Sequence, residues 1–342
     1  MKFIQQSGPH WLGANTVTVM MRRVLLALLP VSLVSVWLFG PGVVLNLAVA
    51  VAACAGFEML ALRLRGLPVA ATLSDYSILV TAALLALSLP PLLPWWVTVT
   101  ACFFATVVAK HLYGGLGYNL FNPAMVGYLV ALIAFPQFVA DWPGLSADHS
   151  WPEAAAALSY FATGALPASF DALSGATPLD TLKEQLGNMR TMAEIRAGEG
   201  FGLLAGYGWE WLNLASLAGG LWLLRLRVIS WHAPGALLAT LGSLYFIGYA
   251  LDSGANPSPV LGLLSGGTMF AAFFIVTDPV SGAASPAGRI VFGAGVGALT
   301  FALRKWGAYP DGLAFAVVLM NMCAPLIDRY TVPRVYGHRQ RP

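Results

Sequence analysis

The sequence predicts an all-α polytopic membrane protein of about ten transmembrane helices, built as two inverted five-helix repeats with broken helices. Of its 342 residues, 58% are hydrophobic and only 10% are charged, whereas soluble domains carry roughly 25% charged residues. The mean hydropathy is +0.73. The apolar runs are continuous and do not alternate as barrel strands do. Lipid is therefore expected to cover much of the surface.

Ten apolar runs, bounded by charged residues, Gly or Pro, supply the expected spans. The first five lie near residues 23–39, 43–62, 76–93, 95–112 and 122–140, and the second five near 210–226, 233–251, 259–277, 288–304 and 311–328. No small-residue cleavage site follows the first run, so it is predicted to be a span and not a signal peptide. The chain divides into a first half (1–140), a polar loop (141–209) and a second half (210–342).

The placement of Lys and Arg predicts the orientation. With both termini on one side, that side holds 13 of the 18 Lys and Arg residues and the other side holds 5. The positive-inside rule then predicts that both termini are cytoplasmic. The expected location of the spans is the inner membrane of a bacterial cell. Arg304 and Lys305 are the exception, because this topology puts them on the far side.

The polar loop over 141–209 is predicted to be periplasmic. It is acidic, with eight Asp and Glu residues against three Lys and Arg, and a structureless loop of this length is uncommon unless it is functional. Within it, Pro178–Arg196 is expected to form a short helix. Thr177 is the expected N-cap, since Pro178 suits the first helical position.

Two stretches rich in Gly and Pro, 110–124 and 277–288, interrupt the two halves near corresponding places. Broken backbone at membrane depth is tolerated where it lines a buried cavity, and pairs of such segments indicate binding sites. The simpler interpretation is that Gly and Pro only mark turns between spans.

The run Asp171, Ser174, Gly175, Ala176 and Thr177 carries the chemistry. By composition it is a turn before a helix, in which Thr177 is a cap worth about 1 kcal/mol. The run also matches the flavinylation motif D-x-x-[S/T]-G-A-T. In proteins with this motif, a flavin transferase joins FMN to the Thr hydroxyl through a phosphoester bond and recognises the Asp and the small residues. The resemblance therefore implies covalent FMN on Thr177.

The rest of the chain resembles the family of D subunits of Rnf electron-transport complexes, and more distantly the B subunit of the Na⁺-translocating NADH:quinone reductase. The similarity runs the full length and includes SDYS at 74–77, GGLGYNLFNPA at 114–124 and TDPVS at 277–281. The resemblance implies an electron relay in a translocase that couples ferredoxin and NAD⁺ to Na⁺ or H⁺ movement. With no nicotinamide fingerprint, the chain is not expected to catalyse a complete reaction alone.

The resemblance also implies the partners. They are a second flavinylated subunit, two small membrane subunits that share an iron–sulfur cluster, cytoplasmic iron–sulfur and flavin subunits, and the flavin transferase. Beyond membrane lipid, no other partner class is predicted, and nucleic acid is excluded. Cys54, Cys102 and Cys323 lack the close spacing of a metal site, so no metal is expected in this subunit.

Weaker site predictions concern polar residues near the breaks. Asn119 and Asn122 are candidates for a second flavin, which resemblance to the quinone reductase subunit suggests is riboflavin; the compatible alternative is that Asn122 caps a helix. Asp278, Asp75 and Glu58 are candidate ion-coupling residues, because acids in or near spans are functional hypotheses by default. His111 is interpreted as an interfacial residue.

A rival from a different class is a urea-type channel or facilitator, because inverted five-helix repeats with broken segments also build such channels. On that interpretation the flavinylation run is incidental and a hydrophilic pore lies between the halves. Flavin content discriminates between the two.

Overall fold

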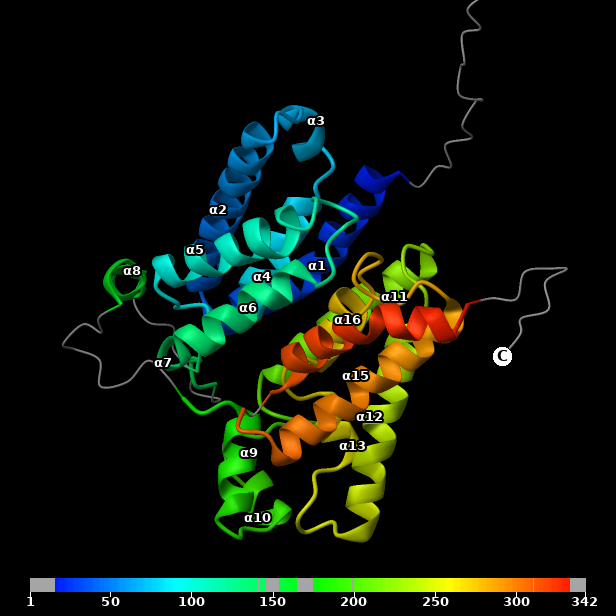
Figure 1. Ribbon diagram of the computed structural model, residues 1–342. Helices are drawn as coiled ribbons and strands as arrows, with labels where there is room; N and C mark the ends of the chain where they lie inside the picture. The colour runs from blue at the N-terminus through cyan, green and yellow to red at the C-terminus, as the bar shows by residue number, and fades with distance from the viewer. Residues whose placement is uncertain are drawn as a thin grey trace, which may run out of the picture.

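The computed structural model describes residues 16–140, 142–145, 154–164, 175–198, 200–309 and 311–332 (Figure 1). Within these ranges the regular structure is helical, with isolated β-bridges at Trp142–Gly175 and Phe201–Gly206. Five described helices are long and apolar enough to cross a membrane, and two shorter helices are also apolar. The fold is therefore that of a polytopic membrane protein.

The first half contains helices at every predicted span. They are α1 (Val17–Phe39), α2 (Gly42–Leu64), α3 (Val69–Leu73), α4 (Ser77–Ser88), α5 (Trp95–Phe103) with its π-helical continuation η1 (Phe104–His111), α6 (Pro123–Ala134) and α7 (Pro136–Val139). The third span is shorter than expected, because α4 ends at Ser88 before the pair Pro90-Pro91, and proline cannot continue a helix.

The second half follows the same pattern. It contains α11 (Trp209–Arg225), α12 (His232–Leu251), α13 (Pro259–Leu263), α14 (Thr268–Phe270) with its π-helical continuation η2 (Ala271–Ile275), α15 (Pro286–Trp306) and α16 (Leu313–Tyr330). The predicted eighth span is divided, because residues 264–267 are not helical. The two halves meet where α1 packs against α11 and α6 against α16. The inverted relation of the halves stays a prediction.

The segment between the halves holds three short helices, α8 (Ala154–Thr163), α9 (Pro178–Gly187) and α10 (Met192–Arg196), at one end of the bundle (Figure 1). The prediction of one helix over Pro178–Arg196 was wrong: the chain breaks at 188–191, where Met189 has a φ of 61°. The break arises because Thr191 starts a second capping box with Glu194, and such side-chain bonds compete with helix continuation.

The expected breaks at 110–124 and 277–288 are confirmed, since residues 112–122 and 276–285 are not helical. Each break directly follows a π-helix, η1 or η2. The sequence analysis missed both π-helices. Such segments are rare and are frequently found at functional sites.

Candidate functional site: a cavity between the halves at Thr177

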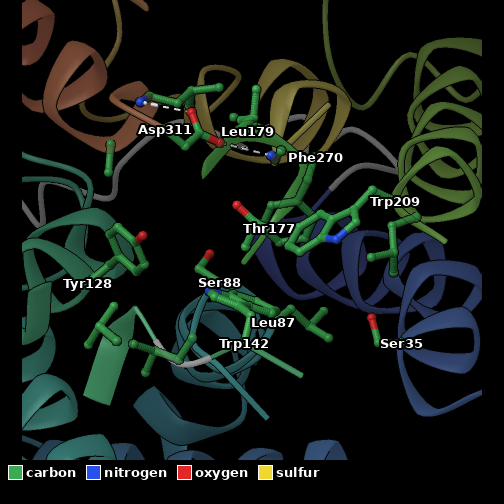
Figure 2. Close-up of a pocket in the computed structure, with 18 of the residues that line it drawn as sticks. Ser35, Leu87, Ser88, Tyr128, Trp142, Thr177, Leu179, Trp209, Phe270 and Asp311 are labelled. Carbon is green, nitrogen blue, oxygen red and sulfur yellow. Dashed lines mark hydrogen bonds between the residues drawn. The ribbon is translucent and has the colours of Figure 1, made fainter. Parts of the chain in front are cut away.

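A cavity of about 250 Å³ lies where the two halves meet (Figure 2). Its volume is close to the lower bound of about 300 Å³ for small-molecule pockets. The walls come from α1, α4, α6, α11, η2 and the start of α9, so residues from both halves and from the central segment contribute. Most of the lining is apolar, with polar groups that include Thr177, Tyr128 and Asp311.

Thr177 lines this cavity as the N-cap of α9, which confirms the predicted cap. Its Oγ1 accepts a hydrogen bond from the Asp180 backbone N–H at 3.2 Å, and its hydroxyl donates to the Asp180 carboxylate. That carboxylate also accepts from the Thr177 backbone N–H at 3.1 Å. These bonds orient the hydroxyl. Asp171 and Ser174 of the same motif lie outside the described residues.

Gly175 brings the motif close to another stretch of backbone. Its N–H donates to the Trp142 carbonyl at 2.8 Å, and a Cβ placed on Gly175 would lie 2.6 Å from the Gly144 Cα. No side chain fits at that distance. Ala176, in contrast, is exposed. The glycine of the motif is thus required by packing in this protein.

Aromatic side chains form one wall of the cavity. The rings of Trp142 and Trp209 lie edge to face with centroids 5.1 Å apart, and Phe39 contacts both. Figure 2 shows Thr177 beside the Trp209 indole. Such a wall offers flat apolar surface to a ring system, since aromatic rings pack favourably on one another.

An ion pair between the partly exposed Asp311, which lines the cavity, and the buried Arg304 supports another part of the wall. The Asp311 carboxylate accepts from the Arg304 guanidinium at 3.1 Å and from the Gly267 N–H at 3.1 Å. Arg304 also donates to the Gly262 carbonyl and the Thr268 hydroxyl, each at 2.9 Å. The Arg304 charge is therefore balanced by Asp311 within the protein.

Gly266 provides a test of this wall. It has a φ of +57°, and a Cβ there would lie 2.3 Å from Asp311 Oδ2. We expect Gly266→Ala to lower the free energy of unfolding by about 1–3 kcal/mol, because it adds both backbone strain and a clash. The measurement is thermal unfolding in detergent. Gly267→Ala is the control, since nothing lies within 4 Å of its added Cβ; equal melting of the two variants would contradict the expectation.

Asn119 and Asn122 are both buried in the first broken segment. Asn122 caps α6 by accepting from the Met125 N–H at 3.2 Å, and its own N–H donates to the Asn321 side chain at 3.1 Å. The Asn119 amide donates to the Phe121 carbonyl at 3.0 Å. The capping role of Asn122 is confirmed, and a second flavin there stays a prediction.

The three acidic candidates lie apart from the Thr177 cavity. Asp75 accepts from the Ser77 N–H at 2.6 Å at the start of α4, and Asp278 accepts from the Ser281 hydroxyl at 2.7 Å. Glu58 is 1% exposed and bonds to Lys110 and to His111. Their ion-coupling role stays a prediction. Within the described ranges, no group of three or more His, Cys, Asp or Glu side chains is arranged to hold a metal.

His111, interpreted from the sequence as an interfacial residue, pairs with an acidic side chain. Its side chain is buried, and its Nε2 lies 2.8 Å from a Glu58 carboxylate oxygen. This pairing was not predicted, because the partner acid is 53 positions away in the sequence. A lone Glu inside an apolar run was the available signal, since such an acid needs a cationic partner.

Comparisons with known proteins identify the family. The NQR2, RnfD, RnfE family model matches residues 4–337. The chain is 49% identical to the D subunit of the ion-translocating oxidoreductase complex of Pseudomonas aeruginosa (strain LESB58), over 99% of this chain and 97% of that protein. It is 45% identical to the protein of the same name from Escherichia fergusonii, over 99% of this chain and 100% of the relative. With that from Vibrio cholerae the identity is 43%, again over 99% and 100%.

Proposed function

The chain belongs to the NQR2, RnfD, RnfE family, and on that basis we propose that it relays electrons through FMN bound covalently to Thr177. It is a subunit of an ion-translocating oxidoreductase complex, as its relatives are named. One observation carries the flavin proposal: the Thr177 hydroxyl belongs to a cavity walled by Trp142 and Trp209. A urea-type channel is not proposed, because membership of this family gives it no support.

The residues present fit such a group. FMN supplies one- and two-electron redox chemistry when it is bound. Thr177 Oγ1 would carry the phosphate, and the N-terminus of α9 favours a negative charge at that position. Trp142 and Trp209 would pack against the ring. Esterification removes the hydrogen that Thr177 donates to Asp180, so the Asp180 carboxylate must give up that contact in the modified protein.

The finer assignment follows from the same resemblance. The complex links ferredoxin and NAD⁺, and the partners are the second flavinylated subunit, the two membrane subunits that share an iron–sulfur cluster, and the cytoplasmic iron–sulfur and flavin subunits. The subunit lies in the bacterial inner membrane with cytoplasmic termini and a periplasmic 141–209 segment. Asn119 and Asn122 hold riboflavin, and Asp278, Asp75 and Glu58 take part in ion coupling.

The test uses the chain expressed together with its flavin transferase. We expect a fluorescent flavin band on a denaturing gel for wild type and none for Thr177→Ala. Thr191→Ala is the matched control, because Thr191 has the same capping role on α10 without the motif. It removes one cap, worth about 1 kcal/mol, and leaves the flavin site intact.

Fluorescence that persists in Thr177→Ala would place the flavin elsewhere. A dark wild-type band, with a transferase that is active on a control substrate, would remove the flavin relay altogether. Equal loss of fluorescence in Thr191→Ala would show that helix capping, and not the hydroxyl at 177, controls the signal.

A further inference from the structure

The hydrogen bonds of the Thr177 hydroxyl suit a nucleophile. A hydroxyl has one hydrogen to donate and two lone pairs that can accept. Thr177 donates its hydrogen to Asp180 Oδ2, and one of its lone pairs accepts the Asp180 backbone N–H at 3.2 Å. The other lone pair receives no hydrogen bond from the described residues. That lone pair can attack an electrophile while the hydrogen points at a carboxylate.

The carboxylate of Asp180 is held in place for this contact. Its Oδ2 atom also accepts the Thr177 backbone N–H at 3.1 Å, in the capping box at the start of α9. The two bonds keep the carboxylate oxygen beside the hydroxyl hydrogen. A hydroxyl that bonds to a base, with the base oriented by a further group, is the arrangement by which proteins activate weak nucleophiles.

Asp180 is also the cavity carboxylate that is available to take a proton. Two carboxylates line the cavity among the described residues, those of Asp180 and Asp311. Figure 2 shows Asp311 on the cavity wall, bonded away from Thr177. It accepts from the Arg304 guanidinium and from the backbone N–H groups of Gly267 and Leu313. No histidine lies among the described residues of the lining.

A second capping box shows what the same bonds do without the cavity. On α10 the Thr191 hydroxyl donates to the Glu194 carboxylate at 3.0 Å, and the Glu194 N–H donates back at 3.4 Å. Thr191 is exposed and does not line the cavity. Capping therefore accounts for the bond pattern at both places. The cavity and the modification motif distinguish Thr177.

We propose that Asp180 is the general base for attachment of the flavin to Thr177. The proposal rests on the function proposed above and adds to it, since Asp180 lies outside the motif, which ends at Thr177. The chain that is modified would thus supply the base for its own modification. An aspartate has the same role in protein kinases, where it accepts the proton of the attacked hydroxyl.

The step balances as a phosphoryl transfer. The flavin donor must carry a leaving group on phosphorus, as the pyrophosphate of a flavin dinucleotide does. As the Thr177 Oγ1–P bond forms, the P–O bond to the departing nucleoside monophosphate breaks, and the hydroxyl proton moves to Asp180 Oδ2. Nothing is oxidised or reduced. Asp180 is partly exposed, so water takes the proton from it afterwards.

The test measures how fast the flavin transferase modifies the purified, unmodified full chain in detergent. The donor is flavin adenine dinucleotide, and the readout is flavin fluorescence on a denaturing gel. We expect Asp180→Asn to lower kcat roughly 100-fold, the lower end of the contribution of a positioned general base, with no change in the KM for the chain. Asparagine keeps an oxygen that accepts the Thr177 N–H, but it takes up no proton.

Glu194→Gln is the matched control. It makes the same change in the capping box of α10, where the Glu194 carboxylate accepts the Thr191 hydroxyl at 3.0 Å and the Thr191 N–H at 2.7 Å. We expect the wild-type kcat and KM for this variant. Melting of both variants in detergent checks that each is folded.

Asp180→Ala with added formate separates proton transfer from structure. Alanine removes the carboxylate and leaves space that a small carboxylate can enter. We expect formate to raise the flavinylation rate of Asp180→Ala roughly tenfold, a part of the contribution that the variant loses. Formate should not change Asp180→Asn, in which the amide fills that space. A purely structural role of Asp180 would not respond to formate.

Several results would overturn the assignment of Asp180. They are a wild-type kcat in Asp180→Asn, a rise in its KM alone, an equal loss of kcat in Glu194→Gln, or an Asp180→Ala variant that does not respond to formate. Failure of the flavin proposal is recognised separately. In that case the wild-type chain itself stays dark while the transferase modifies a control substrate.

Discussion

We expect Lys110→Ala to destabilise the protein so strongly that little of it is recovered folded. The substitution leaves the Glu58 carboxylate, 1% exposed, without its ammonium partner at 2.8 Å. Breaking a buried ion pair by removing one partner costs about 3–5 kcal/mol, which is a large share of a typical stability of about 5–15 kcal/mol. The measurement is the yield of monodisperse protein in detergent, together with its melting temperature.

The double variant Glu58→Gln with Lys110→Met is the control for this prediction. It deletes the same interaction but leaves no charge buried, so we expect melting close to wild type. If Lys110→Ala melted like wild type, Glu58 would not depend on Lys110 for its charge balance. If both variants failed equally, loss of hydrogen bonds and not loss of charge would be the cause.

The second large effect is expected at Gly293, in the most extensive helix pair of the described elements, α12 with α15. A Cβ at Gly293 would lie 2.2 Å from the Ala233 carbonyl oxygen, and one turn later a Cβ at Gly297 would lie 2.7 Å from the Leu237 carbonyl oxygen. Small residues let membrane helices approach this closely. We expect Gly293→Ala to cost about 3 kcal/mol, the upper end of ordinary overpacking.

Gly295→Ala is the matched control on the same helix. Its added Cβ would lie 2.4 Å from the terminal methyl of Met320, and a methionine side chain moves easily because it has three rotatable bonds. We expect Gly295→Ala to melt close to wild type, since alanine also favours the helix. The idea of a tight α12–α15 contact fails if the two variants melt alike.

The helices were largely predictable from the sequence. A long apolar run has few alternatives in a membrane, because every backbone group must be paired within the segment. Prolines also marked helix starts correctly. Helix α6 begins at Pro123 and α9 at Pro178, and the preceding residues Asn122 and Thr177 are their N-caps. The single helix predicted over Pro178–Arg196 was wrong, because the side-chain bonds of the Thr191 capping box compete with helix continuation. The two π-helical segments η1 and η2 were not predicted.

The partners of the charged residues were not predictable. Glu58 and Lys110 are 52 positions apart, and His111 was assigned to the interface because its neighbours gave no sign of a buried acid. Arg304 likewise contacts Asp311 and Thr268, which no pattern in the sequence indicated as its partners. Trp142, Thr177 and Trp209 also line one cavity. No periodic pattern in the sequence indicates that these three residues lie close together.

Local stretches of sequence were enough to establish that this is a multi-span membrane protein, where its spans lie, and which threonine carries the modification motif. These properties depend on the composition of single segments and on short contiguous runs. The folded chain was needed to show that Thr177 lines a cavity between the halves and that Glu58 pairs with Lys110 and His111. Those features depend on which helix faces pack together, and that choice is made by close fit between distant segments.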